Sequence, residues 1–158
     1  MAHLREKTSA RGTVPQTEAR LDSYFASLRG PDGIARLRLL IPANGTSRGR
    51  FHDREVRIEA WRDRDDQNLN DLIRIRWTPE GSVIYPNFAG TLVVRGEGDP
   101  DLSFVELDGD YKHPLGATGE LFDETIGHRI AQSTARELLK DLKRAIDGDA
   151  ITRSIPRY

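Results

Sequence analysis

Histidines and carboxylates are the residues of this sequence whose types could do acid–base or metal chemistry. The four histidines are His3, His52, His113 and His128. No two of them share the i, i+4 spacing that places two imidazoles on one helix face, so no local zinc motif is present. His113 and His128 flank the start of a predicted helix, and Asp123 and Glu124 lie in the same stretch. If the fold gathers these groups they could form a general base; otherwise each histidine is a polar residue at the end of an element.

Two other segments match chemical motifs only superficially. The run Gly45-Thr46-Ser47-Arg48-Gly49 fits the nucleophile elbow G-x-S-x-G, whose chemistry needs a strained turn between a strand and a helix. The segment that follows alternates like a strand, so we interpret the run as a hairpin loop. The acidic run 63–68 opens like a calcium loop but lacks the glycine and the bidentate glutamate of that motif, which predicts a solvated hairpin tip.

Charge is balanced along the chain. The 158 residues include 24 basic and 25 acidic side chains, for a net charge of −1. No positive field is available to collect phosphate backbones, so nucleic acid is not an expected partner. The absence of cysteine excludes disulfides, thiolate metal sites and cysteine nucleophiles. The sequence has no signal-like apolar start and no run of about 18 apolar residues, so we expect a cytoplasmic protein without a membrane span.

Five segments have the period-two alternation of half-buried strands. They are residues 34–43, 54–61, 70–78, 83–95 and 102–112. Turn-forming residues separate them, as at Asn44-Gly45, which predicts one antiparallel sheet with a wet face and a covered face.

Two segments have helical periodicity. Residues 16–28 form a short amphipathic helix with Thr17 as a candidate N-cap, and residues 118–147 form a longer helix with Gly148 as the C-cap. The apolar stripe of the longer helix must be buried, and the covered face of the sheet is its natural partner. The stripe comprises Ile130, Ala131, Thr134, Ala135, Leu138, Leu142 and Ala145.

These elements predict an α+β fold in which a curved antiparallel sheet wraps around a long C-terminal helix. The chain length suits a single domain with one core. We expect residues 1–14 to form a flexible N-terminal arm, residues 15–148 to form the domain, and residues 149–158 to form a C-terminal tail.

Side chains on the covered face and on the helix stripe are the candidates for a ligand-binding space. The predicted lining comprises Trp77, Tyr85, Phe88, Leu92 and Tyr111 from the sheet and Ala131, Thr134 and Leu138 from the helix. Core packing is the ordinary interpretation of such a set and is favoured over pocket lining. The helix gives some support to pocket lining, because Ala131 and Thr134 are short and leave volume that large rings or a guest must fill.

One pattern of aromatic, glycine and proline residues extends over roughly residues 54 to 147. It runs through Trp77, Tyr85-Pro86, Phe88-x-Gly90-x-Leu92, Leu107-x-Gly109-x-Tyr111-x-x-Pro114-Leu115-Gly116 and His128-Arg129-Ile130-Ala131. This pattern resembles small uncharacterised bacterial proteins of the START-like, Bet v 1-like (SRPBCC) superfamily. The resemblance implies a helix-grip fold with a hydrophobic cavity between sheet and helix. Members include lipid and hormone binders, polyketide cyclases and aromatase-like proteins, and they share no catalytic constellation.

The sequence departs from this superfamily in one place. Most helix-grip proteins insert two short helices after the first strand, and the gap between segments 34–43 and 54–61 is too short for them. Either the helix at 16–28 takes over that position or the cavity is reduced.

Three functional hypotheses follow. The first is a protein that binds a hydrophobic small molecule or lipid without transforming it. The second is a cyclase or aromatase-type enzyme on the same fold, in which Tyr111, Tyr85 or His113 assists enolisation. The third is a domain with a filled core that works through protein contacts. No catalytic motif is found, so a non-enzyme is favoured. No metal or cofactor is expected, and the oligomeric state stays open.

Overall fold

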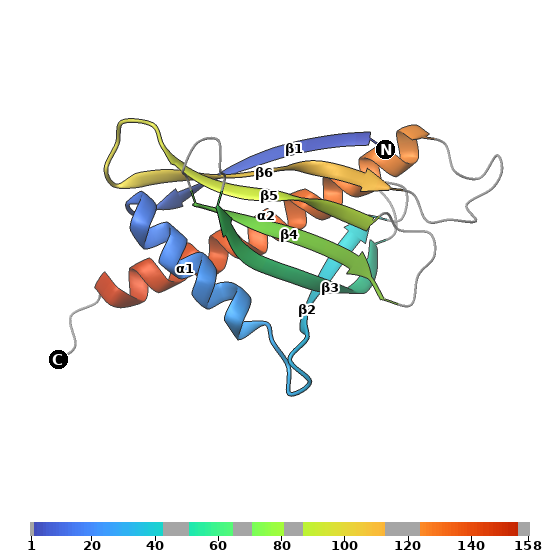
Figure 1. Ribbon diagram of the computed structural model, residues 1–158, viewed down its shortest axis with the longest axis horizontal. Coiled ribbons are helices and arrows are strands. Elements are labelled where there is room, and N and C mark those ends of the chain that lie inside the picture. The colour runs from blue at the N-terminus through green and yellow to red at the C-terminus, as the bar shows by residue number, and fades with distance from the viewer. Residues whose placement is uncertain (1, 43–50, 65–70, 81–86, 113–123, 155–158) are drawn as a thin grey trace.

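The computed structural model describes residues 2–42, 51–64, 71–80, 87–112 and 124–154. Its elements follow the order β1 (Ala2–Arg11), α1 (Val14–Ser27), β2 (Ala35–Pro42), β3 (Phe51–Arg64), β4 (Asp71–Pro79), β5 (Asn87–Gly96), β6 (Leu102–Lys112) and α2 (Glu124–Ser154). All six strands form one antiparallel sheet with the order β1-β6-β5-β4-β3-β2 (Figure 1). The predicted α+β architecture and the antiparallel sheet are confirmed.

The N-terminal segment is the main correction. Residues 1–14 were expected to form a flexible arm, whereas Ala2–Arg11 is an edge strand paired with β6 along its whole length. Its alternation is weak in sequence because the inward positions include Glu6 and Thr8 beside Leu4 and Ala10. Glu6 accepts a hydrogen bond from Gln132 at 2.9 Å and pairs with Arg136 at 3.4 Å, so this inward carboxylate has partners on α2.

Helix α1 begins earlier than predicted. Its N-cap is Thr13, not Thr17: the Thr13 hydroxyl accepts from the Gln16 N–H and the Gln16 side chain accepts from the Thr13 N–H, which is a capping box. Thr17 is buried instead and shares a 2.6 Å hydrogen bond with Ser103 of β6. Since β1 precedes α1, this helix follows the first strand and occupies the position where a helix pair was expected from the resemblance.

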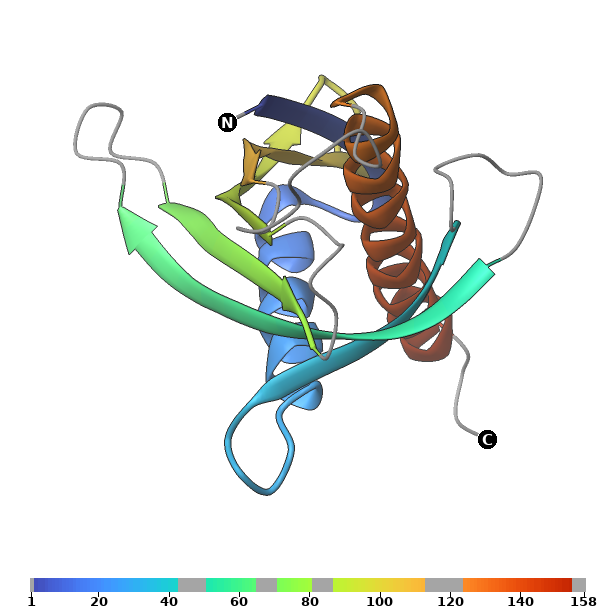
Figure 2. The same cartoon turned by 90° about the vertical axis from the view of Figure 1, so that its right-hand side faces the viewer.

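Helix α2 lies across the hollow of the curled sheet, with α1 beside it (Figure 2). The predicted stripe is confirmed: Ile130, Ala131, Thr134, Ala135, Leu138 and Leu142 are buried, and Ala145 is partly buried. The helix continues to Ser154, so Gly148 is an exposed residue within it and not its C-cap, and the expected tail at 149–158 is helical as far as residue 154. The predicted start at residue 118 lies outside the described residues.

The curl of the sheet sets the distance between α2 and the strands. Most close approaches of α2 to the sheet are to β1 and β2, the two edge strands. The central strands β4 and β5 therefore stand back from the helix, and side chains must fill the space between. Large side chains at the centre of the sheet and small ones on the helix are the pairing that this geometry requires.

Candidate functional site

One row of side chains crosses the covered face of the sheet. Ile58 of β3 lies opposite Trp77 of β4, Trp77 opposite Phe88 of β5, and Phe88 opposite Tyr111 of β6. Directly paired residues in adjacent strands put their side chains on the same face, so this row is continuous. The register thus brings together the three aromatic residues that the sequence analysis assigned to a common space.

The rings of Trp77 and Phe88 form a stacked pair. Their centroids are 4.0 Å apart and their planes differ by 14°. The end of the Phe88 ring lies over Gly90 and Gly109, which face each other across β5 and β6. A Cβ at either glycine would come within 2.8 Å of that ring, so the two glycines make room for Phe88 to lie along the sheet. The Phe-x-Gly and Gly-x-Tyr spacings of the sequence have this packing as their cause.

Tyr111 supplies a polar group at the end of the row. Its hydroxyl lies 2.9 Å from Nδ1 of His128, which is on the exposed surface of α2. The phenol ring of Tyr111 is only 2 % exposed, so the pair joins a buried ring to an imidazole within reach of solvent. Two of the predicted partners, His113 and Asp123, lie outside the described residues. For the third, Glu124, only the backbone is described.

The helix side of the site is apolar. Ala131, Thr134 and Leu138 are all buried, and the Thr134 hydroxyl donates to the Ile130 carbonyl at 2.8 Å. Because this hydroxyl donates within the helix, Thr134 offers no free donor to the sheet.

Trp77 carries the unsatisfied polar atom of this region. The residue is 1 % exposed, and its indole Nε1 has no hydrogen-bond partner among the described residues. A buried donor without an acceptor costs about 1–3 kcal/mol. The only other buried side-chain atom of this kind in the described ranges is Nε of Arg20.

Seven of the eight predicted lining residues lie in the described structure, and all seven are buried. They are Trp77, Phe88, Leu92, Tyr111, Ala131, Thr134 and Leu138. The eighth, Tyr85, lies outside the described residues. Their role in ligand binding stays a prediction, because close packing and ligand contact both place such residues inside.

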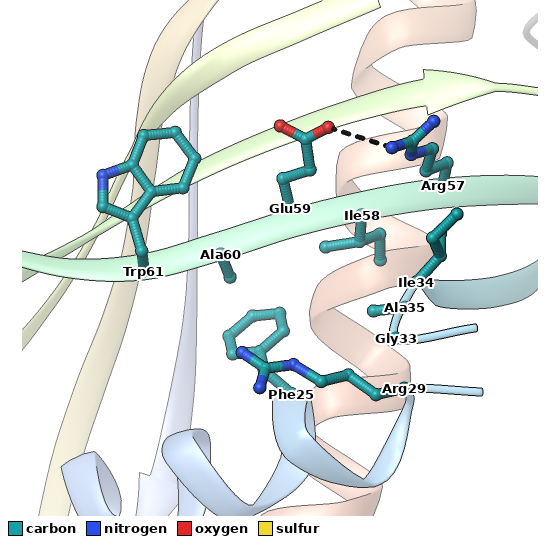
Figure 3. Close-up of a pocket in the computed structure, with 10 residues that line it drawn as sticks. All are labelled: Phe25, Arg29, Gly33, Ile34, Ala35, Arg57, Ile58, Glu59, Ala60 and Trp61. Atoms are coloured by element: carbon teal, nitrogen blue, oxygen red, sulfur yellow. Dashed lines mark ion pairs between the residues drawn. The ribbon is translucent and has the colours of Figure 1, made fainter. Parts of the chain in front are cut away.

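A groove that the sequence analysis missed lies between α1 and β3 (Figure 3). It has a volume of about 260 Å³, and a second hollow of about 320 Å³ continues it toward Ile73. Phe25, Arg29, Ala60 and Trp61 line both parts. The sequence feature that indicated this groove was Trp61, a large aromatic residue at a position of its strand that alternation assigns to the solvent-facing side. Its side chain is 43 % exposed.

No cluster of metal-binding side chains is found in the part of the chain that the structure describes. Among these residues no group of three or more histidine and carboxylate side chains could hold an ion. No described helix is both long and apolar enough to cross a membrane.

Comparisons with known proteins give matches at the level of structure. No family model and no curated protein matches the sequence. An aromatase/cyclase from Streptomyces sp. R1128 matches with a TM-score of 0.53 at 16% identity, over 98% of this chain and 96% of that one. A START superfamily protein from Mycobacterium smegmatis matches with a TM-score of 0.53 at 12% identity, over 92% and 97% of the two chains. This chain has the START-like helix-grip fold.

A third match extends the comparison within the same fold. A conserved protein from Geobacillus kaustophilus matches with a TM-score of 0.56 at 12% identity, and 96% of each chain is covered. All three matches cover nearly the whole of both chains, so β1 and α1 are part of the START-like fold and not an appendage to it. At these identities the likeness concerns the fold alone.

Proposed function

We propose that this START-like protein binds a hydrophobic small molecule between the sheet and α2. The covered face offers a wall of aromatic rings from Trp77, Phe88 and Tyr111. The opposite wall carries the small side chains of Ala131 and Thr134. The sheet centre stands back from α2, so a guest can be accommodated there by rearrangement of side chains and without displacement of the helix from the edge strands.

The observation that carries the proposal is the indole N–H of Trp77. It is buried among apolar groups and has no acceptor within the described residues. A ligand with one carbonyl, ether or hydroxyl oxygen satisfies it and recovers the free energy of the missing hydrogen bond. The expected ligand is therefore apolar over most of its surface and bears at least one acceptor.

A second candidate is an enzyme of the cyclase type, favoured by the bond between Tyr111 and His128. An imidazole that accepts from the phenol is placed to take up its proton as a base, and an imidazole that donates to it holds the hydroxyl hydrogen toward the interior. Either arrangement could move a proton at an enolisable ligand. The pair contacts solvent through His128, which provides the route for that proton.

The third hypothesis is a filled core that acts through protein contacts. One set of binding experiments distinguishes it from the two ligand-binding hypotheses. We expect native mass spectrometry of protein purified from its own host to retain an apolar compound, and Nile red to bind with quenching of tryptophan emission. Thr134→Trp fills the space and should abolish dye binding. Arg129→Trp adds the same ring to an exposed position of α2 and should leave it unchanged. No bound compound and no dye binding would leave the filled core.

The chemistry of Trp77 is tested by a smaller change. Trp77→Phe keeps an aromatic ring but removes the N–H, so it should weaken ligands that carry an acceptor and leave purely hydrocarbon ligands unaffected. Equal losses for both classes would show that the donor plays no part in binding.

A further inference from the structure

The groove between α1 and β3 has features that the interior site does not use. Phe25 forms an apolar part of its floor and Trp61 stands at its rim (Figure 3). Among the described residues, Trp61 is the only large hydrophobic side chain that is exposed. An indole at the mouth of a concave surface offers a flat apolar face for a ligand.

An open strand edge runs along this groove. The pairing of β2 with β3 ends where Ala35 meets Ile58, whereas β4 continues along β3 as far as Arg64. Beyond Ile58, β3 therefore has a neighbour on one side only. This edge faces α1 across the groove.

The register shows which backbone groups point out of that edge. The Glu80 N–H donates to the Glu55 carbonyl at 2.9 Å, so Glu55 directs its backbone groups toward β4. Backbone groups of alternate residues in a strand point to the same neighbour, which assigns the even-numbered residues of β3 to the other side. Ala60 accordingly directs its N–H and C=O toward the open edge. No hydrogen bond to these groups is found within the described ranges.

Charge in the groove is positive. Arg57 pairs with Glu59 at 3.7 Å, and Arg62 pairs with Asp22 at 2.6 Å. Arg29 extends along the groove beside Phe25, and in the described structure no carboxylate lies within ion-pair distance of its guanidinium (Figure 3). One guanidinium is thus left without a counter-charge in a concave, partly apolar surface.

From these features we propose that the groove binds a small hydrophobic carboxylate. The apolar body lies against Phe25 and Trp61, and the carboxylate accepts hydrogen bonds from the Arg29 guanidinium and the Ala60 N–H. Such charge-assisted bonds are the strong ones, and the fork of an arginine matches a carboxylate. The site is separate from the interior between sheet and α2, and the proposal stands whether or not that interior binds a ligand.

Size favours a small molecule over an extended peptide. Strand addition requires a row of consecutive backbone bonds. The edge beyond β2 runs only from Ile58 to Arg64, and next to Ala60 along it the Arg62 side chain pairs with Asp22 of α1, which lines the same groove. Ala60 is the first residue past the end of β2 whose backbone groups point out of this edge, and it lines both parts of the groove.

The test uses naphthoate as the probe and naphthalenemethanol as its neutral counterpart. We expect naphthoate to bind more tightly and to shift the NMR signals of the Ala60 amide and the Trp61 indole. Arg29→Gln should weaken naphthoate by about tenfold, which corresponds to about 1.4 kcal/mol, because it removes a hydrogen bond to a charged group. The affinity for the alcohol should be unchanged. Arg95→Gln removes an exposed cation elsewhere on β5 and should change neither affinity.

Four outcomes would overturn the proposal. Equal affinity for the acid and the alcohol would remove the role of charge, and an unchanged naphthoate affinity in Arg29→Gln would remove that of Arg29. Shifts confined to the Trp77 indole would place the probe in the interior. An acidic extended peptide that displaces naphthoate and shifts the same signals at lower concentration would assign the edge to strand addition.

Discussion

The hydroxyl of Tyr24 donates a hydrogen bond to the carboxylate of Asp141, with 2.8 Å between Oη and Oδ2. Tyr24 belongs to α1 and Asp141 to α2, so this bond joins the two helices that share the hollow of the sheet. Burial, with the added effect of the Asp141 carboxylate, raises the pKa of the Tyr24 hydroxyl above its ordinary value. The protonated phenol is the form that the folded protein stabilises.

Removal of this hydroxyl should lower stability without a change of fold. We expect Tyr24→Phe to reduce the free energy of unfolding by about 1.5–3 kcal/mol, the range for a hydrogen bond to a charged group. Urea unfolding at neutral pH measures the change. Asp141→Asn keeps an acceptor and should cost less, and equal losses for the two variants would contradict the assigned donor and acceptor.

The same bond predicts a pH dependence. Because the folded pKa of Tyr24 lies above its unfolded value, its contribution is fully present below about pH 10, the unfolded pKa. It is lost as the pH rises through the folded pKa. The difference in unfolding free energy between wild type and Tyr24→Phe should therefore be constant from neutral pH to about 9 and shrink at higher pH. A difference that grows with pH would contradict this sign.

The buried face of α2 is tested by charge. Leu138→Asp and Leu142→Asp each place an unpaired carboxylate at a position that is at most 1 % exposed. The cost of several kcal/mol is a large part of a typical stability of about 5–15 kcal/mol, so both variants should unfold. Lys140→Asp alters the exposed face and should be far milder. Thermal melting of the three proteins checks the assignment, and similar melting temperatures would refute it.

The two glycines beneath Phe88 should tolerate no side chain. In Gly109→Ala the new Cβ would lie 2.4 Å from the Ala89 carbonyl oxygen and 2.6 Å from the Phe88 ring, so strands must shift. We expect a loss of about 1–3 kcal/mol, as for other overpacked cores. Gly148→Ala meets open space within α2 and should instead gain up to about 1 kcal/mol. Equal effects in chemical denaturation would argue against the packing described for Phe88.

The two tryptophans offer a matched comparison of core and surface. Trp77→Ala removes a fully buried ring and should cost about 3–5 kcal/mol. Trp61→Ala removes an exposed one and should change stability by about 0.5 kcal/mol or less. The second variant should also weaken both naphthalene probes at the groove. A large loss of stability in Trp61→Ala would mean that this ring is structural.

Periodicity predicted the elements whose two faces differ in polarity. The inward positions of β4, such as Ile73, Ile75 and Trp77, alternate with arginines, and this contrast identified strand, phase and core together. β1 was not predicted as a strand, because a carboxylate, Glu6, occupies one of its inward positions. The partners of Glu6 are on α2, far along the chain, so the local pattern does not reveal them.

The two candidate sites also differ in how far the sequence predicts them. The row of Trp77, Phe88 and Tyr111 follows from strand phase, which can be read locally. The groove depends on where β2 stops beside β3 and on how α1 packs against it, and both are properties of the assembled sheet. Only the outward Trp61 hinted at it.

The pairing of β1 with β6 also has a consequence for how the chain reaches this fold. Ala2 pairs with Tyr111, so β1 leaves the ribosome well before β6, the strand with which it pairs. α1 can form early, since its capping box and its helical bonds are local. Closure of the sheet instead depends on contacts between distant parts of the sequence, which fold slowly. Until β6 is synthesised, Leu4 and Ala10 lack their partner strand, and an unpaired strand with exposed apolar side chains is prone to aggregation during synthesis.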